Sequence, residues 1–555
     1  MKLVNNAKIL FDVARWRMSW YFRNTDYSYR LKSNPKFMGP MDAIQSLVRD
    51  GDVVGFSGLG GNQHVTILYC ALRDSFLNTG HPRDLTVVAI GGMGGRGRIP
   101  GTLEELGRPG LMKRFIGGHL ETYRSFLKLA DQGELDIQVL PQGVLALLID
   151  AQARGASLPP METGKGTFLD PSVGRGSRLL GGDGDQLVSL QDNLLQYQLP
   201  PIDVAIVNAP AADPQGNIYL KNAAIWAESK ELVLAAGRSG GKVIVNIGLI
   251  VDEGYDDIFL TGDQADAVVY WPRTEQVAGI PHHRHYSLFT PQSSVPVEEA
   301  SRMVRFVNTF VGITPRRGEA DKVLARLAAQ VFADQVAPDS LVNVGVGLPE
   351  EVCQVLLETG ILDEITLFTE SGVIGGVPAP GVFFGSAVCP KKLVSSAEIF
   401  KRVYKKLDVT LLGALQVDSE GNVNVSKRGD GARNYVGPGG FIDLTTAADL
   451  VLFVTSWKVG DQFKFVEKVD EITFPGQIAL EKGKRVHYVT HVGAFELTPR
   501  GMTLRQVMPG IDIQKDILDA CPMTIRLPEE NDVPTVDRSV LTGEEFHLKL
   551  RPGNR

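Results

Sequence analysis

The hydrophobic positions along the chain follow two alternating patterns. Short runs rich in β-branched residues are typical of buried strands, and longer stretches with apolar residues at helical spacing separate them. In the first half the strand-like runs are 52–56, 85–90, 204–207, 242–247 and 267–270, and the helical stretches include 41–48 and 64–76. In the second half strand-like runs recur at 341–344, 365–368, 409–412 and 450–454. This alternation predicts an α/β fold of open, mostly parallel sheets covered by helices.

The two halves also resemble each other in sequence. One repeated unit is a strand-like run followed by an aspartate and a Gly-Asn pair, which occurs as 202–207, Asp213 and 216–217, and again as 407–412, Asp418 and 421–422. Two further pairs match, 52–58 with 340–346 and 85–95 with 365–376. Internal similarity of this kind predicts two similar α/β domains in one chain.

Turn-forming residues suggest where the domains meet. Stretches 290–296 and 314–318 are rich in Pro, Gly and Ser, so we expect the join between about Tyr286 and Lys322. We expect an N-terminal extension at 1–38, a first domain at 39–290, a linker at 291–320, a second domain at 321–520 and a C-terminal tail at 521–555. Segment 155–184 is dense in Gly and Pro and is predicted to be a long loop at the domain edge.

The N-terminal extension carries several aromatic side chains among arginines, namely Trp16, Trp20, Tyr21, Tyr27 and Tyr29. We expect a helix packed on the body of the protein. An aromatic surface for a partner or a membrane is the alternative interpretation.

Composition and charge exclude several classes of protein. The formal charge of −7 arises from 64 acidic and 57 basic residues without a long basic block, so nucleic acid is not an expected partner. The apolar segment 9–22 is interrupted by Asp12, Arg15 and Arg17, which disfavours a secretory signal. No other run approaches the roughly 18 apolar residues of a membrane span. We therefore expect a soluble, cytoplasmic protein.

The cysteines give no sign of a disulfide framework or a zinc ribbon. Cys70, Cys353, Cys389 and Cys521 lie far apart and form no CxxC pair. The cluster His282-His283-Arg284-His285 is a weak metal candidate, because adjacent histidines point in different directions and the arginine repels a cation. We expect no metal site.

One carboxylate stands where chemistry is expected in such a fold. Glu370 follows the strand-like run 365–368 and precedes the glycine-rich stretch 371–376. Open parallel sheets bind ligands beyond the carboxyl ends of their strands. The matching first-half stretch, 89–92, has no acid, so the scaffold itself does not require one. Position alone leaves open a solvated turn residue.

Several ordered motifs resemble those of a known family. Glu370-Ser371-Gly372-Val373-Ile374-Gly375-Gly376, together with Asn343-Val344-Gly345-Val346-Gly347-Leu348-Pro349-Glu350, resembles the signature of the family I CoA-transferases, in particular the propionate or acetate CoA-transferase branch with both halves fused. Further matches are 140–143, 421–427 and 437–443, and the resemblance extends from about Asp42 to Asp516. It implies the CoA-transferase (NagB-like) fold in both domains and a homo-oligomer, either a dimer or a tetramer.

The resemblance also implies a mechanism. In that family a glutamate attacks an acyl-CoA thioester to give a mixed anhydride, the released CoA thiolate converts it into a glutamyl-CoA thioester, and an acceptor acid reverses both steps. Glu370 would be this nucleophile. The Gln142 side-chain amide and the Gly440 backbone N–H would stabilise the oxyanion. Coenzyme A would be a co-substrate, with no permanently bound cofactor, and the substrates would be a short-chain acyl-CoA and a carboxylic acid.

Two glycine-rich turns are expected to face the substrates. The residues expected to contact CoA are Gly345, Val346, Gly347, Gly439 and Asn424, and those expected to face the acid substrate are Gly60, Gly61 and Asn62. Glycines at such turns permit close approach of a ligand, but they equally permit a helix to pack on its strand. Segment 250–295 matches the family poorly, and it is a candidate for shaping the acyl pocket or subunit contacts.

Other functions were weighed against this one. A dinucleotide-binding dehydrogenase is suggested by the glycines of 91–97, but their spacing is not GxGxxG. A serine hydrolase is disfavoured because 55–59 is not GxSxG. An acyl-CoA hydrolase, or an acyl-carrier-protein transferase like the α subunits of citrate lyase or malonate decarboxylase, would use the same glutamate. A non-catalytic scaffold is disfavoured by the presence of Glu370.

Overall fold

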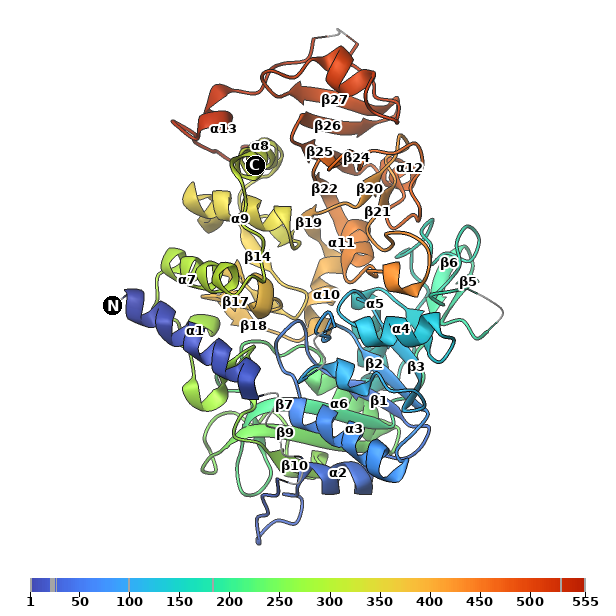
Figure 1. The fold of residues 1–555 in the computed structure, drawn as a ribbon, viewed down its shortest axis with the longest axis vertical. Helices are drawn as coiled ribbons and strands as arrows, with labels where there is room; N and C mark the ends of the chain where they lie inside the picture. The colour runs from blue at the N-terminus through green and yellow to red at the C-terminus, as the bar shows by residue number, and fades with distance from the viewer. Residues whose placement is uncertain are drawn as a thin grey trace.

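A computed structural model describes residues 2–19, 25, 27–97, 100–181, 184–529 and 532–553. The chain forms two α/β units, the first coloured blue to green and the second yellow to red (Figure 1). Each unit is built on an open, mostly parallel sheet. The fold class predicted from the sequence is therefore confirmed.

The sheet of the first half has the strand order β10-β9-β7-β1-β2-β3-β4, with β8 beside β7. Its strands are β1 (Val53–Phe56), β2 (Leu85–Ala89), β3 (Met112–Gly117), β4 (Asp136–Val139), β7 (Val204–Ala212), β8 (Ile218–Tyr219), β9 (Lys242–Ile250) and β10 (Ala267–Tyr270). All pairs along this order are parallel. Every residue of β2 and β7 is buried, which explains why these runs are apolar without alternation.

Helices connect these strands and cover both faces of the first sheet. They are α2 (Pro40–Leu47), α3 (Thr66–Thr79), α4 (Arg124–Asp131), α5 (Gln142–Arg154) and α6 (Ser229–Arg238). Helix α3 connects β1 to β2 and α6 connects β7 to β9, so the two crossovers run in opposite directions from the centre of the sheet. Right-handed crossovers then place α3 and α6 on opposite faces. The strand order reverses between β1 and β7, where such sheets bind ligands.

The sheet of the second half has the order β18-β15-β14-β13-β19-β22-β25-β26-β27. Its strands are β13 (Leu341–Val344), β14 (Thr366–Phe368), β15 (Val373–Ile374), β18 (Lys392–Leu393), β19 (Leu407–Leu412), β22 (Ala448–Val454), β25 (Arg485–Thr490), β26 (Gly493–Thr498) and β27 (Gly501–Val507). Its helices are α8 (Glu319–Gln335), α9 (Leu348–Glu358), α10 (Ser396–Lys405), α11 (Phe441–Ala447) and α12 (Gly476–Glu481). The strands from β14 to β25 are parallel, whereas those at both ends are antiparallel. The sequence patterns did not predict these antiparallel edges.

The internal repeat is visible in the strand order. The order β2-β1-β7-β9-β10 in the first half corresponds to β14-β13-β19-β22-β25 in the second. The repeated aspartates also make the same hydrogen bonds. Asp213 accepts the N–H groups of Gln215 and Asn217, and Asp418 accepts the N–H groups of Glu420 and Asn422. The two similar domains predicted from the sequence are confirmed.

Short two-stranded ladders lie outside the main sheets. They pair β5 (Val188–Gln191) with β6 (Leu194–Tyr197), β11 (Glu275–Val277) with β12 (Ile280–Pro281), β16 (Val377–Pro378) with β17 (Ala387–Val388), β20 (Gln416–Val417) with β21 (Val423–Asn424), and β23 (Lys458–Val459) with β24 (Gln462–Phe463). In the C-terminal tail, α13 (Arg538–Thr542) packs on α8, where the Arg326 side chain donates to the Val540 carbonyl at 2.6 Å.

The segment predicted to be a linker contains a helix that the sequence patterns did not predict. Helix α7 (Val297–Phe310) packs beside α1 (Lys2–Ser19) (Figure 1). Helix α1 buries Ile9 and Val13 against the body, in agreement with the expected docking. Trp20 and Tyr21 lie outside the described residues. The domain boundaries themselves stay a prediction.

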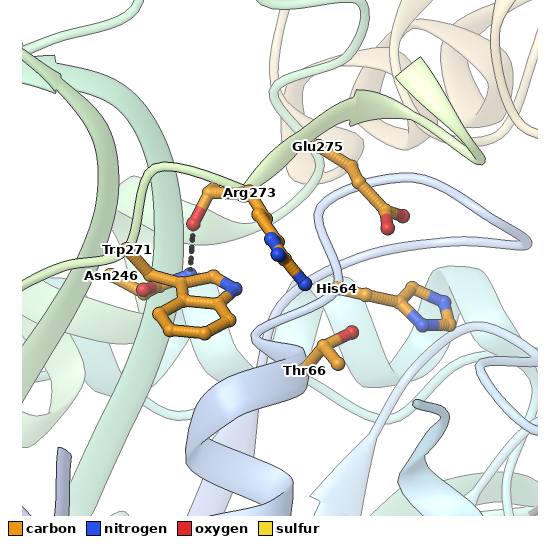
Figure 2. Close-up of a pocket in the computed structure, with 7 residues that line it drawn as sticks. His64, Thr66, Asn246, Trp271, Arg273 and Glu275 are labelled. Atoms are coloured by element: carbon orange, nitrogen blue, oxygen red, sulfur yellow. Dashed lines mark hydrogen bonds between the residues drawn. The ribbon is translucent and has the colours of Figure 1, made fainter. Parts of the chain in front are cut away.

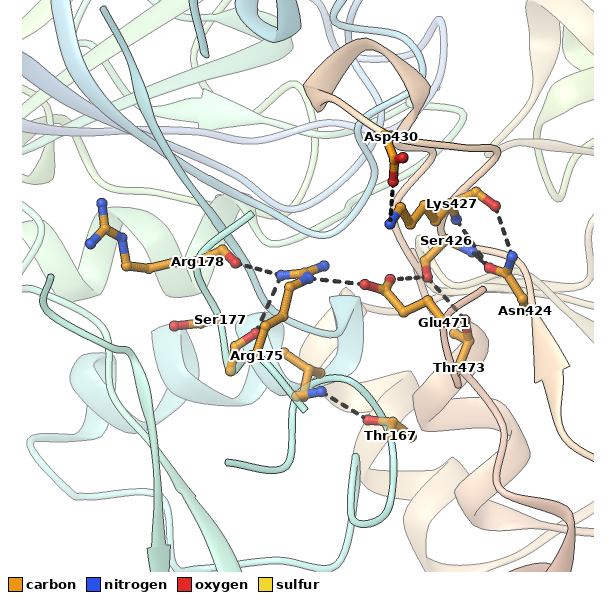
Figure 3. Close-up of polar contacts among 12 residues, drawn as sticks. Thr167, Arg175, Ser177, Arg178, Asn424, Ser426, Lys427, Asp430, Glu471 and Thr473 are labelled. Carbon is orange, nitrogen blue, oxygen red and sulfur yellow. Dashed lines mark hydrogen bonds and ion pairs between the residues drawn. The ribbon is translucent and has the colours of Figure 1, made fainter. Parts of the chain in front are cut away.

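Segment 155–184, predicted to be a long loop at the domain edge, makes contact with the second half. Its described part contains no helix or extended strand. The Phe168 N–H donates to the Ile472 carbonyl at 2.9 Å, and Arg175 donates to Glu471 at 2.9 Å. Figure 3 shows this arginine reaching across to Glu471, whose other oxygen accepts a hydrogen bond from Ser426. The loop therefore fastens the first half onto the second.

Candidate active site

Glu370 lies between the two halves. It follows β14 at the carboxyl end of that strand, as predicted. The Ala227 N–H of the first half donates to the Ser371 carbonyl at 3.3 Å, so the turn after Glu370 is held from across the interface. Gly372 has a φ of 92° and leaves no room for a Cβ, which would lie 2.0 Å from the Val394 carbonyl oxygen. The glycine-rich sequence after Glu370 is thus needed to form this tight turn.

Backbone hydrogen bonds bring the other two predicted catalytic groups together. The Gly439 N–H donates to the Gly118 carbonyl at 2.8 Å, and the Gln142 N–H donates to the Gly439 carbonyl at 2.9 Å. Gly439 belongs to the second half, while Gly118 and Gln142 follow strands β3 and β4 of the first. This crossing places Gly440 and Gln142 next to each other, although they are far apart in the sequence.

Gly440 lies against the carboxyl group of Glu370. A Cβ atom at this position would be 2.9 Å from Glu370 Oε1 and 3.1 Å from Cδ. The backbone of Gly440 has a φ of −86°, which any residue adopts, so the glycine is not required by backbone conformation. It is required because the Glu370 side chain fills the space. Gly440 also precedes α11, and its N–H donates to none of the described residues.

Gln142 presents an unpaired donor at the same place. The residue is 3% exposed, and its Nε2 atom is buried without a hydrogen-bond partner. Its Oε1 atom lies 3.9 Å from where a Cβ on Gly439 would be. An unsatisfied buried donor costs about 1–3 kcal/mol, so it requires an explanation. A substrate oxygen that accepts this hydrogen bond provides one.

The Glu370 carboxyl is poorly solvated. Desolvation, followed by the nearby charge of Asp443, raises its pKa to about 7. The residue as a whole is partly exposed. None of the described residues donates a hydrogen bond to it. A carboxylate that lacks both water and donors is a stronger nucleophile than an exposed one, and at a pKa of about 7 much of it is ionised at neutral pH.

Sequence reasoning overlooked Asp443, which is fully buried below the site. Its carboxylate accepts the N–H groups of Gly143 at 2.9 Å and Val144 at 3.1 Å, and the Tyr404 O–H at 2.6 Å. Burial raises its pKa to about 7. The signal was available, because Asp443 stands between the apolar residues Ile442 and Leu444, and an acid buried among apolar residues needs a partner.

His119 is a second residue that was overlooked. Its Cδ2 atom lies 3.8 Å from where a Cβ on Gly439 would be, and its Nδ1 atom lies 3.0 Å from where one on Gly92 would be. Burial lowers its pKa to about 4, so the imidazole is neutral at neutral pH. Nδ1 is buried without a hydrogen-bond partner. The position directly after β3, at the carboxyl end of a strand, was the available signal.

The residues expected to contact CoA fall into two groups. At Gly347, with a φ of 92°, a Cβ would meet open space, and the neighbouring Val346 is 53% exposed, so this turn is accessible to a ligand. Gly345 donates its N–H to the Leu411 carbonyl at 2.8 Å. Asn424 is fully buried. Its amide donates to Gln416 and to the Lys427 carbonyl, and its oxygen accepts the N–H groups of Ser426 and Lys427, so it has no polar atom to offer CoA.

The turn expected to face the acid substrate packs against the second half. A Cβ on Gly60 would lie 2.1 Å from the Phe384 carbonyl oxygen, and one on Gly61 would lie 2.3 Å from that of Val382. The Asn62 side chain donates to the Phe384 carbonyl at 2.6 Å. These residues therefore have a packing role, and contact with the acid stays a prediction.

A small polar pocket is lined partly by the segment expected to shape the acyl pocket and partly by His64, Thr66 and Asn246. Figure 2 shows it, with Asn246 donating to Thr274 at 2.8 Å and the side chain of Arg273 extending toward His64. It lies beside β9 and β10, whereas Gln142 follows β4 at the opposite edge of the sheet. In the part of the chain that the structure describes, no three His, Cys, Asp or Glu side chains form a metal site, and no helix is long and apolar enough to cross a membrane.

Comparison with known proteins connects this geometry to a family. The family model described as "Coenzyme A transferase" matches residues 326–517. The caffeate CoA-transferase of Acetobacterium woodii is 31% identical over 526 residues, which cover 88% of this chain and 94% of that protein. The chain belongs to the CoA-transferase family. Both halves are fused in one chain, as in the family I enzymes that the motifs resemble.

Further relatives agree with this assignment. The acetate CoA-transferase YdiF of Escherichia coli (strain K12) is 27% identical over 521 residues, which cover 89% of this chain and 93% of that protein. A crystal structure of acyl-CoA transferase YdiF from E. coli O157:H7, in a thioester complex with CoA, superposes with a TM-score of 0.79 at 25% identity, and covers 93% of this chain and 97% of that one. Coenzyme A is thus the co-substrate of this CoA-transferase.

The contact between Gly440 and Glu370 gives a testable expectation. In Gly440→Ala the new methyl group would displace the Glu370 carboxyl from its position, so we expect kcat to fall by about 10²-fold or more. The backbone conformation suits alanine, and we expect the melting temperature to change little. Steady-state transfer assays measure kcat, and thermal unfolding measures the melting temperature.

Gly237→Ala in α6, where a Cβ meets nothing within 4 Å, is the matched control and should keep full activity. Full activity in Gly440→Ala would show that the carboxyl lies elsewhere during catalysis.

Proposed function

We propose that this protein transfers CoA from an acyl-CoA to a carboxylic acid through a covalent glutamyl-CoA thioester on Glu370. The observation that supports this most directly is the arrangement around Gly440. There the poorly solvated carboxyl of Glu370 occupies the space that a Cβ on Gly440 would fill. The Gln142 side-chain amide, whose Nε2 has no hydrogen-bond partner among the described residues, lies beside it. A nucleophile and two donors at one point are what acyl transfer requires.

In the first step the Glu370 carboxylate oxygen attacks the thioester carbonyl carbon of the acyl-CoA. The carbonyl oxygen becomes an oxyanion, which we expect the Gln142 Nε2–H and the Gly440 N–H to stabilise. Collapse of this adduct breaks the C–S bond, which releases CoA thiolate and leaves a mixed anhydride. The thiolate then attacks the glutamyl carbonyl, the acyl group departs as a carboxylate, and Glu370 carries CoA as a thioester.

The acceptor acid reverses both steps, so the thioester bond energy is retained and ping-pong kinetics are expected. Each half-reaction passes through two tetrahedral adducts, one at the acyl carbonyl and one at the glutamyl carbonyl, and the two donors are proposed for the adduct at the acyl carbonyl. The solved YdiF complex with CoA is itself described as a thioester, which supports a covalent CoA adduct in this family.

CoA would approach over the turns that have open space. The accessible turn of Val346 and Gly347 lies at the start of α9, in the same half as Glu370. At Gly439 the nearest atom that a Cβ would meet is His119 Cδ2, at 3.8 Å. We assign these residues to CoA contact, and we leave out Asn424 because its side chain is fully used within its own loop.

The identity of the acid is a separate question. One relative acts on caffeate, a bulky aromatic acid, and another on acetate. We propose a carboxylic acid acceptor and retain a short chain as the first candidate to test. Segment 250–295, including the turn after β10, is the part of the first half in which we expect acid specificity to be set.

The test is to trap the covalent intermediate. The protein is incubated with acetyl-CoA, propionyl-CoA or caffeoyl-CoA without an acceptor, and its intact mass is measured. We expect a CoA adduct on the peptide that contains Glu370, and we expect it to disappear when the matching acid is added, with formation of the new acyl-CoA. Fast release of free CoA without an adduct would instead favour an acyl-CoA hydrolase. No adduct and no turnover with any donor would contradict the proposal.

A further inference from the structure

We propose that the turn 226–229 of the first half positions the nucleophile: Ala227 and Glu228 hold the tight turn that carries Glu370 and fix it relative to Gln142. This inference rests on the proposed function, because it concerns the placement of Glu370 for acyl transfer. Both are positioning residues, which act through the backbone around Glu370 and not on the substrate itself.

Glu370 is the second residue of a tight four-residue turn. The Gly372 N–H donates to the Thr369 carbonyl at 3.0 Å, and the Thr369 N–H donates to the Val373 carbonyl at 2.9 Å. Within the second half, the Val394 N–H donates to the Gly372 carbonyl at 2.9 Å, so one end of the turn is fixed next to β18. The position of the Glu370 side chain therefore depends on how this turn is held.

The first half binds the middle of the same turn. The Ala227 N–H donates to the Ser371 carbonyl at 3.3 Å, and the Ala227 carbonyl accepts the Ser396 N–H at 2.8 Å. Ser396 is the first residue of α10, so its N–H has no partner within that helix. One residue of the first half thus uses both of its backbone polar groups to join the turn of Glu370 to the start of α10.

Ala227 makes these hydrogen bonds from an unusual backbone conformation. Its φ is 49°, in the left-handed region that residues other than glycine rarely adopt. Such a conformation persists only where the surrounding structure holds it, and it occurs preferentially at functional sites. The Ala227 methyl group is fully buried, in a small cluster that contains Leu59 of the first half and Val373 and Leu393 of the second. Side chains from both halves therefore hold the residue in place.

Glu228 anchors the turn on the first sheet. It is 1% exposed, and its Oε1 atom accepts the Gly58 N–H at 3.2 Å, directly after β1. Its Oε2 atom lies 3.4 Å from the hydroxyl oxygen of Ser396. The contacts thus run from the carboxyl end of β1, through Glu228 and Ala227, to the turn of Glu370.

This connection matters because the catalytic groups come from different halves. Gln142 belongs to the first half, whereas Glu370 and Gly440 belong to the second. The hydrogen bonds of Gly439 fix Gly440 beside Gln142, and the turn 226–229 separately fixes Glu370 onto the first half. A misplacement of about 1 Å in a reacting group can cost about 10²-fold in rate. We therefore expect the turn 226–229 to control the acylation of Glu370.

The experiment replaces Ala227 with valine and with glycine. Valine is β-branched and does not readily adopt a φ of 49°, so both backbone hydrogen bonds to the second half should be lost. Glycine adopts this φ without strain and keeps them. The measurement is the single-turnover rate of CoA adduct formation, with a saturating concentration of the acyl-CoA that gives the adduct in the wild type. We expect this rate to fall about 10²-fold in Ala227→Val and to stay within about threefold of the wild type in Ala227→Gly, with a smaller change in KM.

Asp192→Val is the matched control. Asp192 also has a positive φ, of 50°, but it lies in the exposed turn between β5 and β6. The same strain there should lower the melting temperature and leave the rate of adduct formation unchanged. If Ala227→Val does not fold, Glu228→Ala is the second variant. It removes the two side-chain contacts that anchor the turn, and we expect a rate of adduct formation about tenfold below that of the wild type.

The results separate this inference from the proposed function. If the wild type forms the adduct and the folded Ala227→Val or Glu228→Ala protein forms it at the same rate, the turn is only a packing element and the inference alone is overturned. Equal losses of rate in Ala227→Val and Ala227→Gly would also overturn it, because glycine keeps the backbone hydrogen bonds and loses only the methyl group. Absence of the adduct in the wild type would overturn the proposed function, and the inference with it.

Discussion

Replacing Glu370 with glutamine is expected to abolish the CoA adduct and to lower the transfer rate by about 10⁴-fold or more. The amide has nearly the same shape as the carboxyl, but it cannot act as the nucleophile. The fold should be unaffected, because the Glu370 carboxyl accepts no hydrogen bond from the described residues. Because burial raises the pKa of Glu370 from 4.5 to about 7, the wild type loses stability as the pH rises through this range, and Glu370→Gln should melt at a higher temperature above it.

Intact-mass measurement with acyl-CoA and thermal unfolding at two pH values test this expectation. Glu364→Gln is a useful control, since Glu364 is an exposed glutamate that precedes the start of β14. This substitution removes the same charge at the end of the strand that is opposite to Glu370. That variant should form the adduct at the wild-type rate. Adduct formation by Glu370→Gln would show that another residue is the nucleophile.

Replacing Gln142 with alanine is expected to lower kcat by about 10²–10³-fold with a smaller change in KM. One oxyanion donor contributes about 2.7–4 kcal/mol to the transition state, and little to the bound substrate. Because Nε2 has no hydrogen-bond partner in the protein, its removal breaks no internal hydrogen bond. The adduct should still form, but slowly, which single-turnover kinetics would show.

Gln152 on the same helix is the matched control with the opposite expectation. Its Nε2 atom donates to the carbonyl groups of Leu199 and Pro200, both at 3.0 Å. Gln152 lies near the end of α5 that is opposite to Gln142. Gln152→Ala should therefore lower the melting temperature and leave kcat unchanged. A fall in melting temperature without a fall in kcat for Gln142→Ala would assign Gln142 a structural role only.

Much of the fold could be predicted because its signals are local. Strand β13 was predicted with its observed ends, and β10 likewise, since buried parallel strands are short β-branched runs. Helix α7 was not predicted because the turn-forming stretches on both sides of it, 290–296 and 314–318, indicated a linker. Strand β25 and the antiparallel strands β26 and β27 were not predicted, because the strand-like runs named in the second half end at 450–454.

The candidate site was predictable only in part. Glu370, Gln142 and Gly440 were named from motifs, and the structure brings the last two together across the halves. Asn424 sits in a matching motif, yet its side chain holds its own loop together. A sequence motif does not tell whether a residue contacts a ligand or holds its own loop together, because either role can require the same residue type.

The sequence by itself determined the central parallel strands of both sheets, the duplication of the α/β unit and the choice of one acid at a strand end, because periodicity and repetition are properties of neighbouring residues. Only the tertiary structure decided which residues surround that acid. The packing of one half on the other brings Asp443 under α5, closes loop 155–184 over the interface and removes water from Glu370. Burial and its effect on pKa depend on contacts between distant segments, which local patterns do not encode.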